Sequence, residues 1–263
     1  MWSELMVQFS VADPVQAFDF EHQRVFPIIQ DAILPTGVRC VEYHSSAVDL
    51  TNFESLPFVE QELVNTAMDR RKSDFGDSRW CAHQAMRTFI PDEPILRGYR
   101  GMPLWPSPVV GSITHTEGYR AAIVGRSSRW RSLGIDAEPL EPLPQGVFNA
   151  IARPEEARRL RRLARQLEWN HPAQGKLGLV LFSAKEATYK SWFPLTGRFL
   201  DFDEADIDIR PNGTFSSRLL TSESPVPAIE GVWLVDKGYV VTISGIRNFD
   251  GLRSPNGNNY FIG

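Results

Sequence analysis

The chain has 263 residues, of which 42% are hydrophobic and 23% charged, and this length allows one large domain or two small ones with a substantial core. Its net charge of −4 argues against a general nucleic-acid binder, and no apolar run reaches the roughly 18 residues needed to span a membrane. The first residues lack the basic stretch and long apolar core of a secretory signal, and the two cysteines, Cys40 and Cys81, are too few for a disulfide framework, so we expect a cytoplasmic protein.

In the N-terminal half, alternating and β-branched runs predict strands, and apolar residues at helical spacing predict helices. Gly76 is expected to separate two helices, and Gly118 to give the tight turn of a hairpin. In chain order we expect a strand over Arg39–Leu50, helices over Phe58–Lys72 and Asp77–Ile90, and paired strands over Val109–Thr114 and Tyr119–Gly125.

In the C-terminal half, Pro154 opens an amphipathic helix with leucines on one face and arginines on the other. A second helix over Ala184–Phe193 is expected to stop at Pro194. The remaining segments predict strands at Leu133–Glu138, Asp206–Arg210, Thr214–Leu220, Gly231–Val235 and Tyr239–Ser244.

The two halves contain a weak internal echo. Gly118–Val124 is similar to Gly238–Ser244, and each segment forms the second strand of a predicted hairpin. Two similar α+β halves that meet near residue 133 would explain this likeness, and so would chance.

The strand predicted at Leu133–Glu138 carries two carboxylates, Asp136 and Glu138. Side chains two residues apart on a strand point to the same face, so their charges repel each other unless a cation lies between them. Hard oxygen ligands of this kind suit Mg²⁺. Such pairs are also common at solvated strand ends, and this pair on its own favours that plainer interpretation.

Glu186 strengthens the metal interpretation. The segment Ser183-Ala-Lys-Glu186 has the spacing of a capping box, which would place Glu186 in the first turn of a helix. The partial positive charge of a helix N-terminus favours an ionised carboxylate, the form that a metal ligand or a general base requires. A purely structural capping glutamate fits the same spacing.

Two of the five lysines of the chain, Lys185 and Lys190, lie on this helix close to Glu186. An ordinary ion pair between Glu186 and Lys190, four residues apart, is the plain explanation for the second lysine. Both lysines together, within an otherwise apolar and aromatic helix, favour phosphate binding.

Three other segments contain candidate anion-binding residues. Arg71 and Arg79 lie eight residues apart, or two turns of a continuous helix, although a solvated helix face is the default interpretation. Arg100 lies in the loop Arg97–Pro103, whose glycines let the backbone approach a ligand. His115 ends a predicted strand, where a histidine is usually packed and hydrogen-bonded.

Together these segments resemble the signature motifs of 4′-phosphopantetheinyl transferases, in particular the large single-chain type that includes the surfactin-synthetase and enterobactin-component-D enzymes. The likeness covers roughly residues 65–200, with the motifs in the right order. The matching segments are Arg70–Ala82, Gly101–Pro106, Gly111–His115 (GSITH), Gly134–Glu138 (GIDAE) and Phe182–Lys190 (FSAKEATYK).

The resemblance implies an α+β fold of two similar α/β halves, residues 1–133 and 134–263, related by a pseudo-twofold axis with the ligand cleft between them. It implies transfer of the phosphopantetheine arm of coenzyme A to a serine of an apo acyl or peptidyl carrier protein, with release of adenosine 3′,5′-bisphosphate. The implied metal is Mg²⁺, with Mn²⁺ also suitable. The implied partners are carrier domains of fatty-acid, polyketide or peptide synthases, served by a monomer.

The resemblance also implies roles for individual residues. Asp136, Glu138 and Glu186 match the metal ligands, and Glu186 also matches the base that takes the serine proton. Lys190 matches a catalytic position that contacts phosphate. The implied coenzyme A contacts are Arg71, Arg79, Arg100, Ser112, Thr114, His115, Lys185 and Lys190.

Two other functions predict different sequences. A non-catalytic coenzyme A or nucleotide-binding protein on the same fold predicts loss of a metal-binding carboxylate or of Lys190, and none is lost. A nucleic-acid-binding module that uses Arg153–Arg165 predicts a basic stripe without opposing acids, whereas Glu155, Glu156 and Glu168 accompany that helix.

Overall fold

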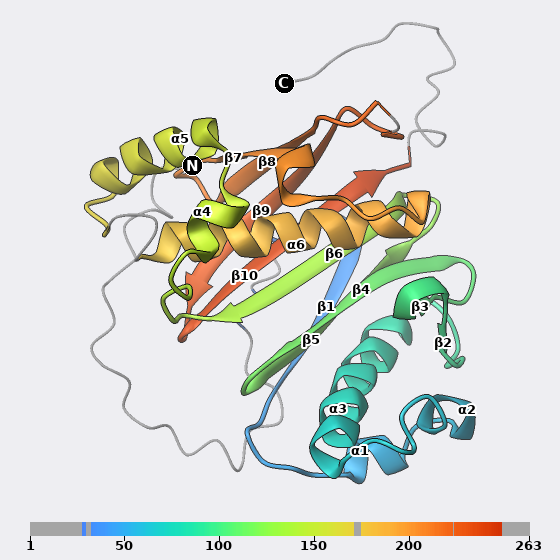
Figure 1. Cartoon of the computed structure of the whole chain (residues 1–263). Helices are drawn as coiled ribbons and strands as arrows, with labels where there is room; N and C mark the ends of the chain where they lie inside the picture. Colours follow the sequence, from blue (N-terminus) through green and yellow to red (C-terminus); the bar gives the residue numbers. More distant parts are fainter. Residues whose placement is uncertain (1–27, 30–32, 171–174, 223, 249–263) are drawn as a thin grey trace, which may run out of the picture.

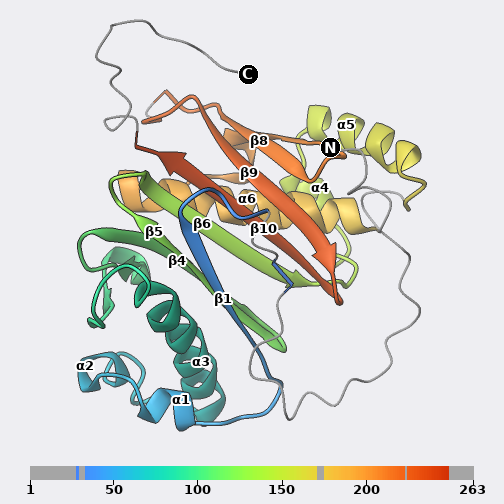
Figure 2. The same ribbon diagram turned by 180° about the vertical axis from the view of Figure 1, so that it is seen from behind.

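The computed structural model describes residues 28–29, 33–170, 175–222 and 224–248. They form an α+β architecture with two main antiparallel sheets, in agreement with the predicted fold class. Figure 1 shows the two long helices, α3 (Asp69–Met86) and α6 (Lys176–Thr196), on one side of the sheets, and Figure 2 shows the strands from behind. In this part of the chain no helix is both long enough and apolar enough to cross a membrane.

The smaller sheet comes from the N-terminal part and has the strand order β1-β5-β4. The predicted hairpin of β4 and β5 turns at Gly118, whose positive φ of 73° is favoured by glycine. The C-terminal half of α3 packs on the sheet through small apolar residues such as Ala82 and Ala85. The elements are β1 (Val38–His44), α1 (Thr51–Glu54), α2 (Phe58–Gln61), α3, β2 (Leu96–Arg97), η4 (Tyr99–Gly101), β3 (Pro103–Leu104), β4 (Val109–Thr116) and β5 (Tyr119–Arg126).

The larger sheet has the strand order β6-β10-β9-β8-β7, with α6 across one face. The predicted hairpin of β9 and β10 turns at Gly238. The amphipathic helix predicted from Pro154 is present and buries Leu160, Leu163 and Ala164. The elements are β6 (Trp130–Pro139), α4 (Val147–Ile151), α5 (Pro154–Gln166), α6, η6 (Phe202–Glu204), β7 (Ala205–Ile209), β8 (Thr214–Leu219), β9 (Ala228–Asp236) and β10 (Tyr239–Arg247).

The two sheets meet where β4 lies beside β6. The backbone N–H of Ile135 on β6 donates to the Ser112 hydroxyl on β4 over 3.1 Å. A shared apolar core continues across the junction and includes Ile123 of β5 and Ile243 of β10. The predicted division between residues 133 and 134 falls inside β6, and the pseudo-twofold relation of the halves stays a prediction.

Three predicted helix boundaries are wrong. Gly76 does not separate two helices, because α3 runs through it and the missing side chain makes room for the backbone of Phe53 on α1. The residues predicted as one helix over Phe58–Lys72 contain only α2 and the start of α3. Helix α6 begins at Lys176 rather than Ala184 and continues through Pro194 to a left-handed Gly197.

A buried polar network fixes the segment that leads into β2. Glu60 of α2 is fully buried, and its carboxylate accepts from the N–H of Ile95 at 3.0 Å and the Arg79 guanidinium at 3.1 Å. His83 of α3 bridges Glu60, at 2.8 Å, and Asp92, at 2.5 Å. The network therefore joins α2 and α3 to the chain that carries η4 and β3.

His83 makes this anchor sensitive to pH. Burial lowers the pKa of His83, but hydrogen bonds to Glu60 and then Asp92 outweigh burial, and the net pKa is raised. A raised histidine pKa stabilises the fold fully below about pH 6.5, and this contribution disappears as the pH rises through the folded-state pKa. We expect the difference in melting temperature between the wild type and His83→Gln to shrink from pH 6 to pH 9. A constant difference across this range would show that the fold does not raise the pKa of His83.

Candidate active site

Asp136 and Glu138 lie on the face of β6 that looks toward α6, whereas Ala137 between them packs into the shared core. Helix α6 approaches this strand closely because Gly134 has no side chain. A Cβ at Gly134 would clash with the Ala187 carbonyl and the Ser191 hydroxyl of α6. The glycine of the GIDAE motif therefore brings Glu186 and Lys190 to the carboxylates of β6.

Lys190 connects three segments at the centre of the site. Its ammonium group lies 2.8 Å from Asp136 Oδ1, 3.0 Å from the Ile135 carbonyl and 3.4 Å from Thr114 Oγ1. These contacts come from α6, β6 and β4, so the lysine spans the junction between the two sheets. The side chain remains partly exposed, at 28%, and can contact a ligand.

Three carboxyl groups lie close together around Lys190. Burial and then the charge of Asp136 raise the pKa of Glu138 to about 7. The same two causes raise the pKa of Glu186. The mutual effects place the three carboxylates within electrostatic reach of one another, with Lys190 as the lysine that offsets them.

The donor set fits a hard divalent cation. Among the described residues no group of three potential metal ligands is already assembled around one point. However, Asp136 Oδ2 is buried without a hydrogen-bond partner, beside two carboxyl groups whose ionisation is disfavoured. A cation bound by oxygen ligands would relieve all three conditions at once.

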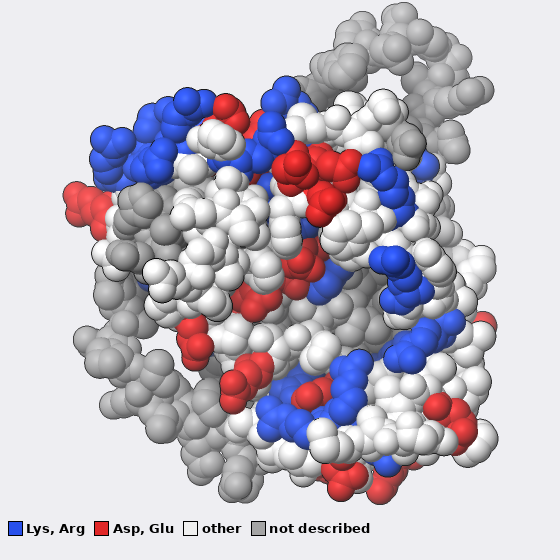
Figure 3. All heavy atoms as spheres, in the orientation of Figure 1, with Lys and Arg blue, Asp and Glu red and all other residues white. Residues whose placement is uncertain are grey.

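A basic pair lies at one end of the site. The Arg71 guanidinium of α3 is 3.3 Å from Nε2 of His115, the exposed residue near the end of β4. Partial desolvation and the nearby arginine lower the pKa of His115. Figure 3 shows a hollow across this face of the molecule, with acidic atoms toward α6 and basic atoms toward α3.

A cavity of about 210 Å³ lies at the other end. Its walls are mostly apolar, and they include the polar side chains of Lys190 and Ser112. The indole Nε1 of Trp105 in this wall is buried without a hydrogen-bond partner. The lining residues are Arg100, Gly101, Met102, Pro103, Trp105, Gly111, Ser112, Ile113, Tyr189, Lys190, Phe193 and Pro194.

Comparison with known protein families identifies this arrangement. The family model described as the 4′-phosphopantetheinyl transferase N-terminal domain matches residues 59–125, and that of the 4′-phosphopantetheinyl transferase superfamily matches residues 132–244. The chain belongs to the 4′-phosphopantetheinyl transferase superfamily. The two matched ranges contain all the candidate site residues.

Individual relatives of this family support the assignment. The chain is 38% identical over 229 residues to 4′-phosphopantetheinyl transferase Npt of Nocardia iowensis, which covers 81% of the chain and 97% of that relative. It is 42% identical over 195 residues to PptT of Mycobacterium tuberculosis, covering 70% and 82%. It is 43% identical over 202 residues to Svp of Streptomyces mobaraensis, covering 72% and 78%. The family and these relatives make the protein a transferase.

Not every residue predicted to contact coenzyme A lies beside Lys190 and the three carboxylates. Arg79 is buried in its ion pair with Glu60 and also donates to the Ile95 carbonyl. Arg100 lies in the cavity wall, on the opposite side of Lys190 from Arg71 and His115 along β4. A phosphate contact by Arg79 would require it to leave Glu60, so this role stays a prediction without support from the geometry.

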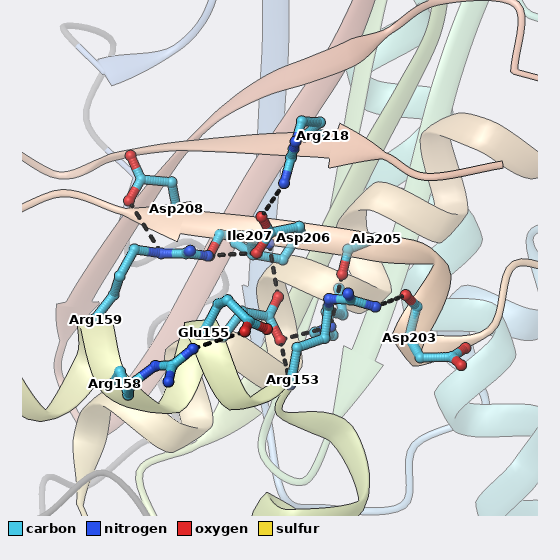
Figure 4. Close-up of polar contacts among 12 residues, drawn as sticks. Arg153, Glu155, Arg158, Arg159, Asp203, Ala205, Asp206, Ile207, Asp208 and Arg218 are labelled. Atoms are coloured by element: carbon cyan, nitrogen blue, oxygen red, sulfur yellow. Dashed lines mark hydrogen bonds and ion pairs between the residues drawn. The ribbon is translucent and has the colours of Figure 1, made fainter.

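Lys185 also points away from Asp136, because adjacent residues on a helix are turned about 100° apart. Its ammonium group lies 3.0 Å from Glu156 of α5 and donates to the carbonyls of Phe202 and Ala205. Figure 4 shows the surrounding contacts among α5, β7 and β8. The predicted phosphate contact of Lys185 has no support in this arrangement, which instead buries the lysine as an anchor.

Sequence reasoning missed the apolar half of the site. Tyr189 and Phe193 look like core residues at helical spacing, yet both line the cavity. Met102 and Trp105 belong to a proline-rich crossing that has no periodic pattern. The only available signal was the match of Gly101–Pro106 to the family, which indicates a segment but no contact.

Proposed function

We propose that the protein transfers the 4′-phosphopantetheine arm of coenzyme A to a serine hydroxyl of an apo carrier protein and releases adenosine 3′,5′-bisphosphate. The observation that carries this proposal is the meeting of Asp136, Glu138 and Glu186 with Lys190 between a basic pair and an apolar cavity. The order of these parts along the site matches the order of chemical groups in coenzyme A.

The nucleotide end of coenzyme A carries a 3′-phosphate, which suits Arg71 and His115. The pyrophosphate would then lie beside the carboxylates and Lys190, whose ammonium group is a compact point charge for phosphate. The pantetheine arm, which is long and largely uncharged, fits the mostly apolar cavity beyond Lys190. Binding energy at both ends would orient the pyrophosphate for attack.

Asp136, Glu138 and Glu186 would hold Mg²⁺, and Mn²⁺ suits the same oxygen ligands. When bound, the cation would neutralise charge on the pyrophosphate and on the departing bisphosphate. Binding also fits the ionisation of the site, since a cation favours the charged forms of Glu138 and Glu186. The close approach of α6 to β6 at Gly134 holds the ligands in place.

The chain's own groups account for the proton and the phosphate. The serine oxygen of the carrier forms a new bond to phosphorus, and the bond from phosphorus to the bridging oxygen of the pyrophosphate breaks. Glu186 takes the serine proton, directly or through a water molecule, which requires its ionised carboxylate. Lys190 orients the phosphate that is attacked.

All the proposed site residues belong to one chain, which supports action as a monomer, and we keep the cytoplasm as the expected location. Carrier domains of fatty-acid, polyketide or peptide synthases share the required feature, a serine that can enter the cleft. The site residues do not distinguish these three classes, so a panel of carriers is the suitable substrate set.

The test is incubation of the protein with coenzyme A, Mg²⁺ and each apo carrier of such a panel, followed by mass spectrometry of the intact carrier. We expect one carrier at least to gain the mass of one phosphopantetheine arm. Chelation of the metal with EDTA should stop the gain, and added Mg²⁺ or Mn²⁺ should restore it. No gain on any carrier would contradict the proposed function.

A further inference from the structure

An exposed apolar patch borders the cavity of the site. We name it the aromatic rim and define it by four side chains with exposed fractions of 43% for Leu96, 62% for Tyr99, 42% for Leu104 and 51% for Phe199. Three of them belong to β2, η4 and β3, and the fourth follows α6. Large apolar side chains gathered on a protein surface commonly mark an interaction site.

The aromatic rim continues directly into the cavity wall. The Tyr99 ring stacks on Phe193 at 6.0 Å between centroids, with 14° between the planes. The Phe199 ring lies 5.4 Å from Tyr189. Phe193 and Tyr189 both line the cavity, so the rim surrounds part of the cavity opening. The rim residues come from both halves of the chain, because β2, η4 and β3 precede β6 and Phe199 follows α6.

The charge around the aromatic rim is one-sided although the protein is acidic overall. Residues 95–110, which carry three of the four rim side chains, contain two basic residues, Arg97 and Arg100, and no aspartate or glutamate. Arg97 and Arg100 are exposed, and neither has a carboxylate partner among the residues that the structure describes. A partner that covers this surface would match it with apolar side chains flanked by carboxylates.

We infer that the aromatic rim is the docking surface for the carrier protein, an inference that rests on the proposed function. Serine has one of the shortest side chains, so the carrier's backbone must come close to the phosphate beside Lys190. The surface around the carrier's serine must then cover the opening of the cavity that Lys190 lines, and the rim is the large exposed apolar surface at that opening. The carrier should therefore present apolar and acidic side chains around its acceptor serine.

The test compares the wild type with Tyr99→Ser/Phe199→Ser, using the carrier that gains mass with the wild type. We expect the KM for the carrier to rise at least tenfold, with kcat at saturating carrier within twofold of the wild type, because the rim would bind substrate and transition state alike. The dissociation constant for coenzyme A, measured by calorimetry, should stay within twofold. A charge variant, Arg97→Glu, should raise the same KM and make it less sensitive to salt.

Phe58→Ser is the matched control, because Phe58 is 74% exposed at the start of α2 and outside the rim. We expect it to leave the KM for the carrier unchanged. An unchanged KM in the rim variants would overturn the docking surface while leaving the proposed function intact. If the wild type is a dimer and the double substitution makes it a monomer, the rim is an interface between two copies of the chain, and the inference is overturned. An effect confined to coenzyme A binding would overturn it as well. Absence of transfer by the wild type would instead remove the proposed function, and this inference with it.

Discussion

Replacement of Glu186 by glutamine, or of Asp136 by asparagine, is expected to slow phosphopantetheine transfer at least about a thousandfold without unfolding the protein. Glutamine at position 186 cannot accept the serine proton and is a weaker ligand for a divalent cation. Asparagine at position 136 removes one negative charge from the ligand set and the carboxylate that holds Lys190. Initial rates at saturating coenzyme A, carrier and Mg²⁺ measure the loss.

The Glu186 substitution is also expected to raise the melting temperature at pH 8 when no divalent cation is present. The raised pKa of Glu186, caused by burial and the charge of Asp136, means that ionisation of this group weakens the folded state. This penalty is absent at low pH, where the carboxyl group is protonated. It grows as the pH rises above the ordinary pKa of a glutamate side chain. Glutamine is neutral and avoids it, so the variant should be inactive yet more stable.

Glu141→Gln is the control for these substitutions, because Glu141 is an exposed carboxylate just beyond β6. Its rate should match the wild type. Mg²⁺ alone should raise the melting temperature of the wild type but not that of Asp136→Asn, a readout that does not depend on activity. Near-normal rates in both site variants would exclude these carboxylates from the active site.

The sequence predicted the chemical groups of the site better than their surroundings. The alternation of β6 correctly placed Asp136 and Glu138 on one face, since side chains two apart on a strand share a face. Local turn chemistry also located the β4–β5 and β9–β10 hairpins at Gly118 and Gly238. These features depend on neighbouring residues alone, which is why local patterns capture them.

The start of α6 was predicted wrongly for a physical reason. Ser183 and Glu186 have the spacing of a capping box, but Ser183 lies inside the helix and its hydroxyl pairs with Thr242 of β10 at 2.9 Å. Glu186 is therefore far from the helix N-terminus, and its ionisation is set by burial and neighbouring charge. A serine that bonds across 59 residues of sequence has the same local pattern as a cap.

Local sequence patterns also failed to predict the buried ion pairs. Arg79 and Lys185 both look like exposed cations in the sequence, but each meets a buried glutamate from another element, Glu60 and Glu156 respectively. Nothing in the spacing of these residues indicates the pairing. Long-range partners of this kind decide whether a basic residue faces a ligand or the interior.

The ion pair of Lys185 and Glu156 is almost completely buried. The exposed fractions of the two side chains are 2% and 0%. Burial lowers the pKa of Lys185 and raises that of Glu156, so each charge depends on the other. Glu156 also accepts from the N–H groups of Arg153 at 2.7 Å and Ile207 at 2.6 Å, which ties α5 and β7 to α6.

Lys185→Met is expected to destabilise the fold by about 3–5 kcal/mol, because it leaves the Glu156 carboxylate buried without its cation. For a chain of this size the melting temperature should fall by roughly 10 °C. The double substitution Lys185→Met/Glu156→Gln should recover part of this loss, since it removes the uncompensated charge, although the glutamine amide can accept only one of the two N–H groups that Glu156 holds. Lys176→Met on the same helix, where the lysine lies 5.2 Å from the Trp169 ring, should change stability by only about 1 kcal/mol.

The double variant also decides between an anchor and a phosphate ligand at position 185. An anchor can be replaced by a neutral pair, so the KM for coenzyme A should stay near the wild-type value once the fold is restored. A direct phosphate contact cannot be replaced by methionine, and the KM would then rise at least tenfold in a folded protein. We expect the first result, because the Lys185 ammonium group is already held by Glu156 and two backbone carbonyls on the side of α6 away from Asp136.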